Sequence, residues 1–351
     1  MSGKFTSTRL HEYFDLDFDQ DCVEFAIPFL QEDIRLFIDP FLLWSSNDPV
    51  YQQLHKHLMD FFENIRHLIK NNRETDALKL LLACSEPHEL GLGFSSSSKR
   101  GSTIGQKLAR DIVSMYKFVP QLSEGGLNHI EEVQMVVRNI SNDRISDITY
   151  AVLKGYFIKF TGQQSLKHNI PTQNYLMEGF YDFDQKKWGS GRKVALPYNP
   201  YDNSPIVLAP VNLLRHLPWI NYGEYCHSYY RRIVLPPDKT KDKLKEAVRF
   251  NKEAVLEYNR KNYVHVMGYV AVKEKAAAQC KPEPFTELAI SEEALRNANR
   301  SLALLEKQVA IYNSSLVPTH LQIDWENKQV EVRRLEDKVE ELKKRTLSNQ
   351  S

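Results

Sequence analysis

The chain has 351 residues, enough for more than one domain of ordinary size. Its 42% hydrophobic and 26% charged residues are typical of a folded globular protein and exclude disorder of the whole chain. Lys and Arg (46) nearly balance Asp and Glu (45), so net charge does not mark the chain as a nucleic-acid binder. Any phosphate binding must therefore come from a local patch.

The spacing of the cysteines and the lengths of the apolar runs indicate in which cellular compartment the protein is expected. Cys22, Cys84, Cys226 and Cys280 are widely scattered and lack C-x-x-C spacing, which favours reduced thiols over a zinc site or a redox pair. The N-terminus turns acidic early and has no apolar core of a secretory signal. No apolar run approaches the roughly 18–20 residues that span a bilayer. We expect a cytoplasmic protein without a membrane segment.

The first half of the sequence predicts one strand followed by helices. Residues 33–40 are rich in β-branched and aromatic side chains and predict a strand that places Asp39 at its C-terminal end. Apolar residues at spacings of three and four predict helices over 49–71, 74–83, 106–117, 130–140 and 146–160. Four glycines and seven Ser or Thr residues make 85–105 a predicted loop.

The second half predicts a hairpin and then helices. Two apolar tracts within 193–210 flank a turn-forming stretch and predict a hairpin. The polar and glycine residues that accumulate in 161–192 predict a boundary between domains. Helices are expected from Pro237 onward and over 291–312. The segment 321–345 fits two patterns, a coiled-coil seam and a β-hairpin that leads into a helix. Both interpretations remain open at this point.

These elements predict an α/β (α+β) fold with a helix-rich N-terminal body, a small sheet, a hairpin and a mainly helical C-terminal region. Three parts are expected. Residues 1–165 would form an α/β catalytic or nucleic-acid-binding domain, 166–235 a β-rich connecting subdomain, and 236–351 a helical region suited to assembly.

A set of carboxylates in the first half could support metal-dependent phosphodiester cleavage. This chemistry needs carboxylates to hold Mg²⁺ and a cation to stabilise charge on the phosphate. The candidate catalytic residues are Asp39, Glu89, Asp143, Asp147 and Lys154. Among them Asp39, Glu89 and Asp147 are the predicted magnesium ligands. Lys154 follows Asp147 by seven residues, so a helix would present both on one side.

The Gly/Ser-rich loop could hold phosphate. Lys99, Arg100 and Ser102 precede a predicted helix N-terminus, where positive charge, hydroxyls and backbone N–H groups favour anions. The sequence contains neither a P-loop nor a dinucleotide-binding glycine motif at a clear strand. A surface connector is the alternative interpretation of this loop.

Structural roles compete with the catalytic ones. Asp147 follows Ser146 at a predicted helix start, where capping and the helix dipole favour acidic residues. Asp143 is a common turn residue, and Asp39 before Pro40 can simply end its strand. The structural role is the more frequent one for such residues.

Several segments resemble a group of bacterial proteins that accompany mobile elements and antiphage defence genes. They are Asn142–Thr149 with Phe160–Gln164, Leu36–Leu42, the Gly/Ser loop after Glu89, and Lys193–Pro197 with Pro205–Pro210. The similarity to PD-(D/E)xK nucleases is loose, because no Asp is followed by Glu-x-Lys on a second strand.

The resemblance implies a role in antiviral defence, with the carboxylates suggesting a Mg²⁺-dependent nuclease that acts on nucleic acid. One alternative is a non-catalytic component that binds other defence proteins, or a second copy of itself, through its C-terminal helices. The other is a nucleotide or small-molecule sensor that uses the Gly/Ser loop.

Overall fold

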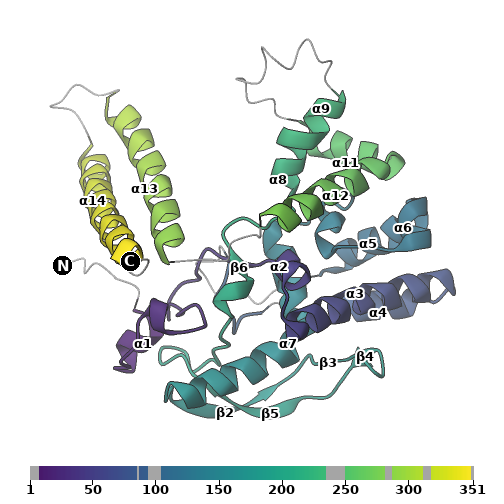
Figure 1. The fold of residues 1–351 in the computed structure, drawn as a ribbon, viewed down its shortest axis with the longest axis horizontal. Helices are drawn as coiled ribbons and strands as arrows, with labels where there is room; N and C mark the ends of the chain where they lie inside the picture. The colour runs from purple at the N-terminus through teal and green to yellow at the C-terminus, as the bar shows by residue number, and fades with distance from the viewer. Residues whose placement is uncertain are drawn as a thin grey trace. The chain divides into compact units, whose positions relative to one another are not determined.

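The computed structural model describes residues 8–84, 87–93, 104–234, 250–280, 287–310 and 318–348. The chain divides into two compact units, Met1–Pro284 and Phe285–Ser351 (Figure 1). The predicted boundaries near 165 and 235 both lie within the first unit. The fold is mostly helical with small two-stranded sheets and a helical C-terminal region, which confirms the predicted class.

The N-terminal part is irregular up to a short strand. It contains α1 (Leu10–Tyr13) and the 3₁₀ turn η1 (Gln20–Cys22). The strand predicted over 33–40 is reduced to β1 (Phe37–Ile38), which pairs antiparallel with β6 (Leu214–Arg215). Asp39 follows β1 directly and is the N-cap of α2 (Pro40–Ser45), so its place at the end of a strand is confirmed.

The amphipathic helices form as predicted. They are α3 (Pro49–Lys70), α4 (Glu74–Leu82) and α5 (Gln106–Phe118), with α6 (Pro120–Gly125) after them. Asp48 caps α3 by accepting a hydrogen bond from the backbone N–H of Val50, and Pro49 supplies the preset φ of the first turn. The apolar stripe of α3, including Leu58 and Phe61, is fully buried.

The helix that carries most of the candidate residues begins earlier than predicted. Residues 130–140 contain only the 3₁₀ helix η2 (Ile130–Met135), and α7 runs over Asn142–Lys167. The predicted gap between the helices over 130–140 and 146–160 is wrong at 142–145, because α7 already begins at Asn142 and Ser141 caps it by accepting from the N–H of Arg144. Ser146 lies inside α7, where its hydroxyl accepts from the N–H of Ile38 at 3.0 Å.

A two-stranded ribbon covers one side of α7 (Figure 1). The predicted hairpin within 193–210 forms only next to its turn, where Ile206 donates to the carbonyl of Pro197 at 2.8 Å. Along its length β5 (Arg192–Pro197) pairs with β2 (Thr172–Met177). Residues 198–205 still form a turn, closed by a bridge between Tyr198 and Pro205. The tract after it pairs with the N-terminal part, since Ala209 accepts from the N–H of Ala26. A second ribbon joins β3 (Tyr181–Asp182) to β4 (Lys187–Trp188).

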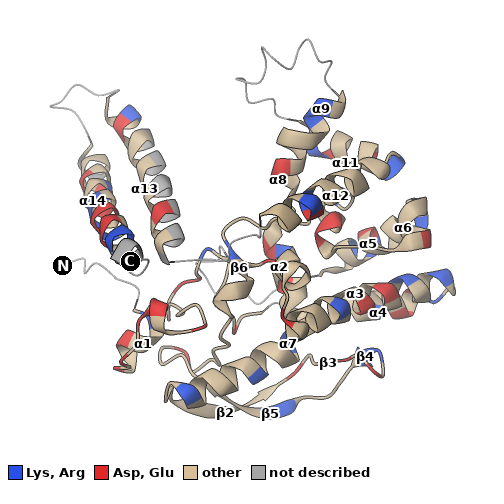
Figure 2. Cartoon of the chain, in the orientation of Figure 1, with Lys and Arg blue, Asp and Glu red and all other residues tan. Residues whose placement is uncertain are grey.

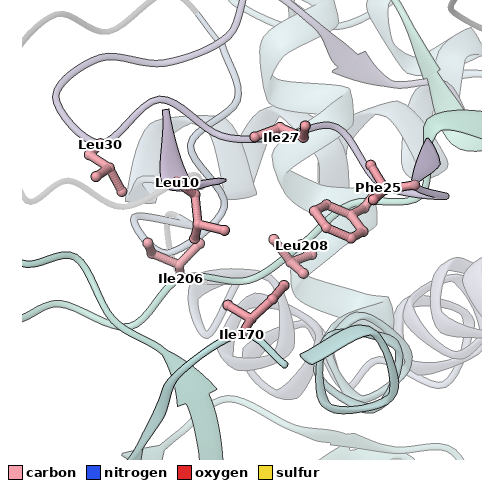
Figure 3. Close-up of a cluster of buried hydrophobic side chains, with 8 residues drawn as sticks. Leu10, Phe25, Ile27, Leu30, Ile170, Ile206 and Leu208 are labelled. Carbon is pink, nitrogen blue, oxygen red and sulfur yellow. The ribbon is translucent and has the colours of Figure 1, made fainter. Parts of the chain in front are cut away.

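One buried cluster joins distant segments of the chain (Figure 3). Phe25 and Ile27 from the N-terminal part meet Ile170 after α7 and Leu208 after the turn. Each such side chain stabilises the fold by about 1.5–3 kcal/mol through burial. Thr161 on α7 also accepts from the N–H of Leu208 at 2.9 Å. The cluster therefore fixes the segments that flank α7.

Helices beyond residue 221 complete the first unit. After η3 (Val211–Leu213) come α8 (Tyr222–Glu224), the π-helix η4 (Tyr225–Tyr230), α9 (Arg231–Val234), α11 (Lys252–Lys261) and α12 (Val264–Gln279). Residues 235–249 lie outside the described residues, so the first part of the helix predicted from Pro237 cannot be compared with the structure. Asn259 donates to the carbonyl of Met135 at 2.8 Å, and the indole of Trp219 donates to the carbonyl of Lys273 at 3.1 Å. These bonds join α11 and α12 to the preceding part.

The second unit is a pair of helices, α13 (Glu287–Val309) and α14 (Thr319–Ser348), which pack against each other. Because α14 is continuous, the β-hairpin interpretation of 321–345 is wrong. One seam of α14 is formed by its buried residues Leu321, Val332, Val339 and Leu342. Charged residues occur along most of the length of α14 (Figure 2). No helix in the described part of the chain is long and apolar enough to cross a membrane.

Candidate functional site

One face of α7 carries four residues that could bind a ligand or support its binding. Asp143, Asp147, Tyr150 and Lys154 follow one another at steps of four, three and four residues, which place them on the same side of a helix. Asp143 and Asp147 are partly exposed, whereas Tyr150 and Lys154 are buried. Tyr150 was missed by the sequence analysis, although the same spacing includes it.

Glu89 meets this face at a buried ion pair. The Lys154 Nζ atom lies 2.7 Å from Glu89 Oε1, and the two side chains are only 7% and 10% exposed. The Tyr150 hydroxyl donates to the same oxygen at 2.8 Å. Burial, reinforced by the Glu89 carboxylate, raises the pKa of Tyr150 well above its usual value, so the hydroxyl stays protonated. Glu89 and Lys154, two of the predicted catalytic residues, are thus brought together.

The turn that carries Glu89 is anchored through its backbone. The carbonyl of Glu89 accepts from the N–H of Val207 at 2.6 Å. Ile34 donates to the carbonyl of Gly91 and accepts from the N–H of Gly93, both at 2.9 Å. Gly93 has a φ of +124°, and a Cβ there would lie 2.7 Å from Asp143 Oδ1. Only glycine therefore allows this close approach to the first turn of α7.

Asp39 lies apart from the α7 face and binds the start of α2 and the segment around Trp219. Its buried carboxylate accepts from the backbone N–H groups of Phe41 at 3.2 Å and Trp219 at 2.8 Å, and lies 3.5 Å from Arg215 Nε. Burial raises the pKa of Asp39 to about 6, against the opposing effects of these N–H groups, Arg215 and Lys273. Asp39 thus ties α2 to the segment around Trp219.

The predicted set of three magnesium ligands is not assembled. Across the described ranges, no three His, Cys, Asp or Glu side chains are grouped so as to hold a metal ion. Asp39, Glu89 and Asp147 all lie within those ranges, so the structure does not bring their carboxylates together. The physical reason is that Asp39 caps α2, while Asp147 lies on the α7 face and Glu89 contacts that face through Tyr150 and Lys154.

A second acidic group, next to Asp39, was not predicted. Glu131 and Glu132 in η2 are almost completely buried. Burial and the charge of Asp39 raise the pKa of Glu131. Glu132 accepts a hydrogen bond from the hydroxyl of Tyr263 and two from the N–H groups of Asn128 and His129. An acidic pair flanked by apolar residues was the sequence signal for this structural cluster.

The predicted phosphate contacts Lys99, Arg100 and Ser102 lie outside the described residues, as does most of the Gly/Ser loop invoked for a sensor. The structure resumes at Ile104, and α5 begins at Gln106 after Gly105. The role of the three residues in binding phosphate stays a prediction.

Comparisons with known proteins give one match. No curated protein and no solved structure matches the chain. A family model described as a domain of unknown function, DUF8370, matches residues 15–221. This match spans more than half of the chain and includes Glu89 and the whole candidate face of α7. The chain therefore belongs to the DUF8370 family.

Proposed function

We propose that this protein acts in bacterial antiviral defence as a Mg²⁺-dependent nuclease, with Glu89 and Asp147 as its metal-binding carboxylates. The observation that carries the proposal is the α7 face, where Asp147 lies one turn from Tyr150 and two turns from Lys154, which both contact Glu89. The similarity of Asn142–Thr149 to defence-associated proteins supports the biological context.

The donor set fits magnesium. Mg²⁺ in proteins usually keeps several waters and takes one or two carboxylates together with substrate phosphates. Glu89 and Asp147 supply the two carboxylates of the proposed site. When bound, the ion would polarise a phosphodiester and lower the pKa of a coordinated water.

The residues around the carboxylates would hold the site in shape. Lys154 was predicted to stabilise charge on the phosphate, but its ammonium group pairs with Glu89 Oε1. It would therefore neutralise Glu89 in the absence of substrate. Lys154 and Tyr150 both approach Oε1, so the ion would bind Glu89 through Oε2.

The test is cleavage of plasmid, single-stranded DNA and RNA by the purified chain, with and without Mg²⁺. We expect cleavage only with Mg²⁺, reduced about 100-fold or more in Asp147→Asn, because one ligand of the ion is lost. Asp60→Asn is the matched control, since Asp60 is an exposed aspartate on α3. No cleavage of any substrate, or equal cleavage by Asp147→Asn, would contradict the proposal.

A second candidate function is that of an assembly component, and the second unit favours it. Ile323 and Val330 lie seven residues apart on α14, away from its buried seam, and are 51% and 53% exposed. Apolar residues at this spacing share one face and suit a contact with a second copy. The full chain should then self-associate in light scattering, and Ile323→Asp with Val330→Asp should yield monomers. A monomeric wild type would refute self-assembly.

A further inference from the structure

The ribbon of β2 and β5 presents one face to solvent. Directly opposite residues of two paired strands share a face, so the pairs Asn174–Ala195 and Leu176–Lys193 lie on the same side of the ribbon. All four of these residues are exposed, whereas Leu196 on the opposite side is buried. Because β5 packs against α7 and β2 packs mainly against β5, this side of the ribbon is an uncovered surface.

Positive charge gathers at one end of the ribbon. Between residues 185 and 201 the chain carries Lys186, Lys187, Arg192 and Lys193 and no acidic residue. All four cations are exposed, and none of them is part of an ion pair within the described part of the chain. Figure 2 shows this charge in blue at β4 and β5. In a chain whose net charge is only +1, it is a local excess suited to a polyanion.

Nearby acidic residues offset this charge least at Lys193. Asp182 lies directly opposite Lys187 in the ribbon of β3 and β4. Glu178 lies beside Gly191, one residue before β5 begins. Lys193 belongs to the exposed face instead, and neither β2 nor β5 contains an acidic residue. The strongest positive charge is therefore on the exposed face, at the start of β5.

This end of the ribbon is joined to the helix that carries the proposed site. The guanidinium carbon of Arg192 lies 4.7 Å from the centroid of the Phe180 ring. A Cβ atom at Gly155 of α7 would lie 3.9 Å from Cδ1 of the same ring. Gly155 directly follows Lys154, so the ring connects the positive end of the ribbon to α7 one residue from Lys154.

The exposed face fits a duplex better than a single strand. Single strands are held largely by aromatic side chains that stack on the bases, and Tyr175, the aromatic residue of β2, belongs to the opposite face. The major groove of B-DNA admits a two-stranded ribbon, and the six residues of each strand span about 20 Å. Thr172 and Asn174 supply hydrogen-bonding groups for base edges, and Leu176 supplies an apolar contact for a thymine methyl group.

We propose that the exposed face of the β2–β5 ribbon binds duplex DNA, with Arg192 and Lys193 contacting phosphates and Asn174 facing the groove. The choice of nucleic acid as the polyanion rests on the proposed function, because a nuclease must hold its substrate. The ribbon itself needs no metal ion. Binding of this kind releases counterions, so the logarithm of the affinity falls with the logarithm of the salt concentration by about 0.9 per phosphate contact.

The test is binding of the full chain to labelled duplex DNA of random sequence at several salt concentrations, measured by fluorescence anisotropy. EDTA is present throughout, so that Mg²⁺-dependent cleavage does not contribute. The ribbon variant is Arg192→Gln with Lys193→Gln. The matched control is Lys70→Gln with Lys79→Gln, because these exposed lysines of α3 and α4 change the net charge equally. Circular dichroism and thermal melting of both variants would establish that they fold.

We expect the slope of log affinity against log salt to become shallower by about two in the ribbon variant and to stay unchanged in the control. At about 0.1 M salt the ribbon variant should bind about 10–100-fold more weakly than the wild type. Single-stranded DNA of the same length should bind the wild type more weakly than the duplex does.

The outcomes separate the ribbon from the nuclease. Duplex binding that depends on the ribbon, in a protein that cleaves no substrate, supports the proposal and refutes the nuclease. Equal slopes for the wild type and the ribbon variant overturn the proposal and leave the nuclease standing, as does tighter binding of single strands. A wild type that binds phosphatidylserine vesicles and not DNA would assign the charge to a membrane surface and overturn the proposal.

Discussion

Replacing Lys154 by methionine should lower the free energy of unfolding by about 3–5 kcal/mol, because it leaves the Glu89 carboxylate buried without its counter-charge. Methionine keeps most of the side-chain volume, so packing changes little. The two side chains are 7% and 10% exposed and their charged atoms are 2.7 Å apart. Screening by water, which reduces exposed ion pairs to about 0–1 kcal/mol, is therefore weak here.

The assay is equilibrium unfolding in urea, followed by tryptophan fluorescence. The double variant Glu89→Gln with Lys154→Met should recover much of the loss, since a neutral amide no longer needs the ammonium and still accepts from Tyr150. A Lys154→Met protein within about 1 kcal/mol of the wild type would refute the reasoning, because it would mean that the pair is solvated. A double variant no more stable than Lys154→Met would also count against it.

Three further predictions concern other parts of the chain. Because burial raises the pKa of Asp39 from 3.8 to about 6, its contribution to stability is complete below pH 3.8 and is lost as the pH rises through 6. The loss is about 3 kcal/mol at about 1.4 kcal/mol per pKa unit, and Asp39→Asn should remove this part of the pH profile in urea titrations. A fragment that ends at residue 221 should show no cooperative thermal transition, whereas Met1–Pro284 should, because α11 and α12 supply hydrogen bonds to buried groups. In the second unit, Leu342→Ala should cost about 2–5 kcal/mol in chemical unfolding and the exposed control Asn327→Ala at most about 0.5 kcal/mol; equal losses would contradict the packing of α14.

Helices with a clear apolar stripe were predictable from the sequence. The burial of Leu58 and Phe61 on α3 follows from their spacing, which tertiary contacts did not override. The strand β2 was missed because most of Thr172–Met177 is exposed on both faces, so it lacks the alternation that marks a strand. Its pairing with β5 depends on contacts between residues far apart in the sequence, and the local pattern of apolar residues carries no information on such contacts.

The candidate site was predictable where spacing on one helix decided the geometry. The shared side of Asp147 and Lys154 followed from their separation, and Glu89 was included because it lies at the mouth of the loop. Asp39 was grouped with them wrongly. Asp followed by Pro is also the signature of a helix N-cap with proline in the first turn, and that local signal describes its position in the structure.

The close approach of Gly93 to Asp143 offers a way to separate the position of a carboxylate from its charge. An alanine at 93 would put a methyl group 2.7 Å from Asp143 Oδ1 in a backbone conformation that L-residues rarely adopt, so one of the two must move. Where the side chain of Asp143 moves and the backbone at 93 does not, the acid is displaced while its chemistry stays intact. Gly93 has no functional group of its own, yet its replacement would change the geometry of the α7 face.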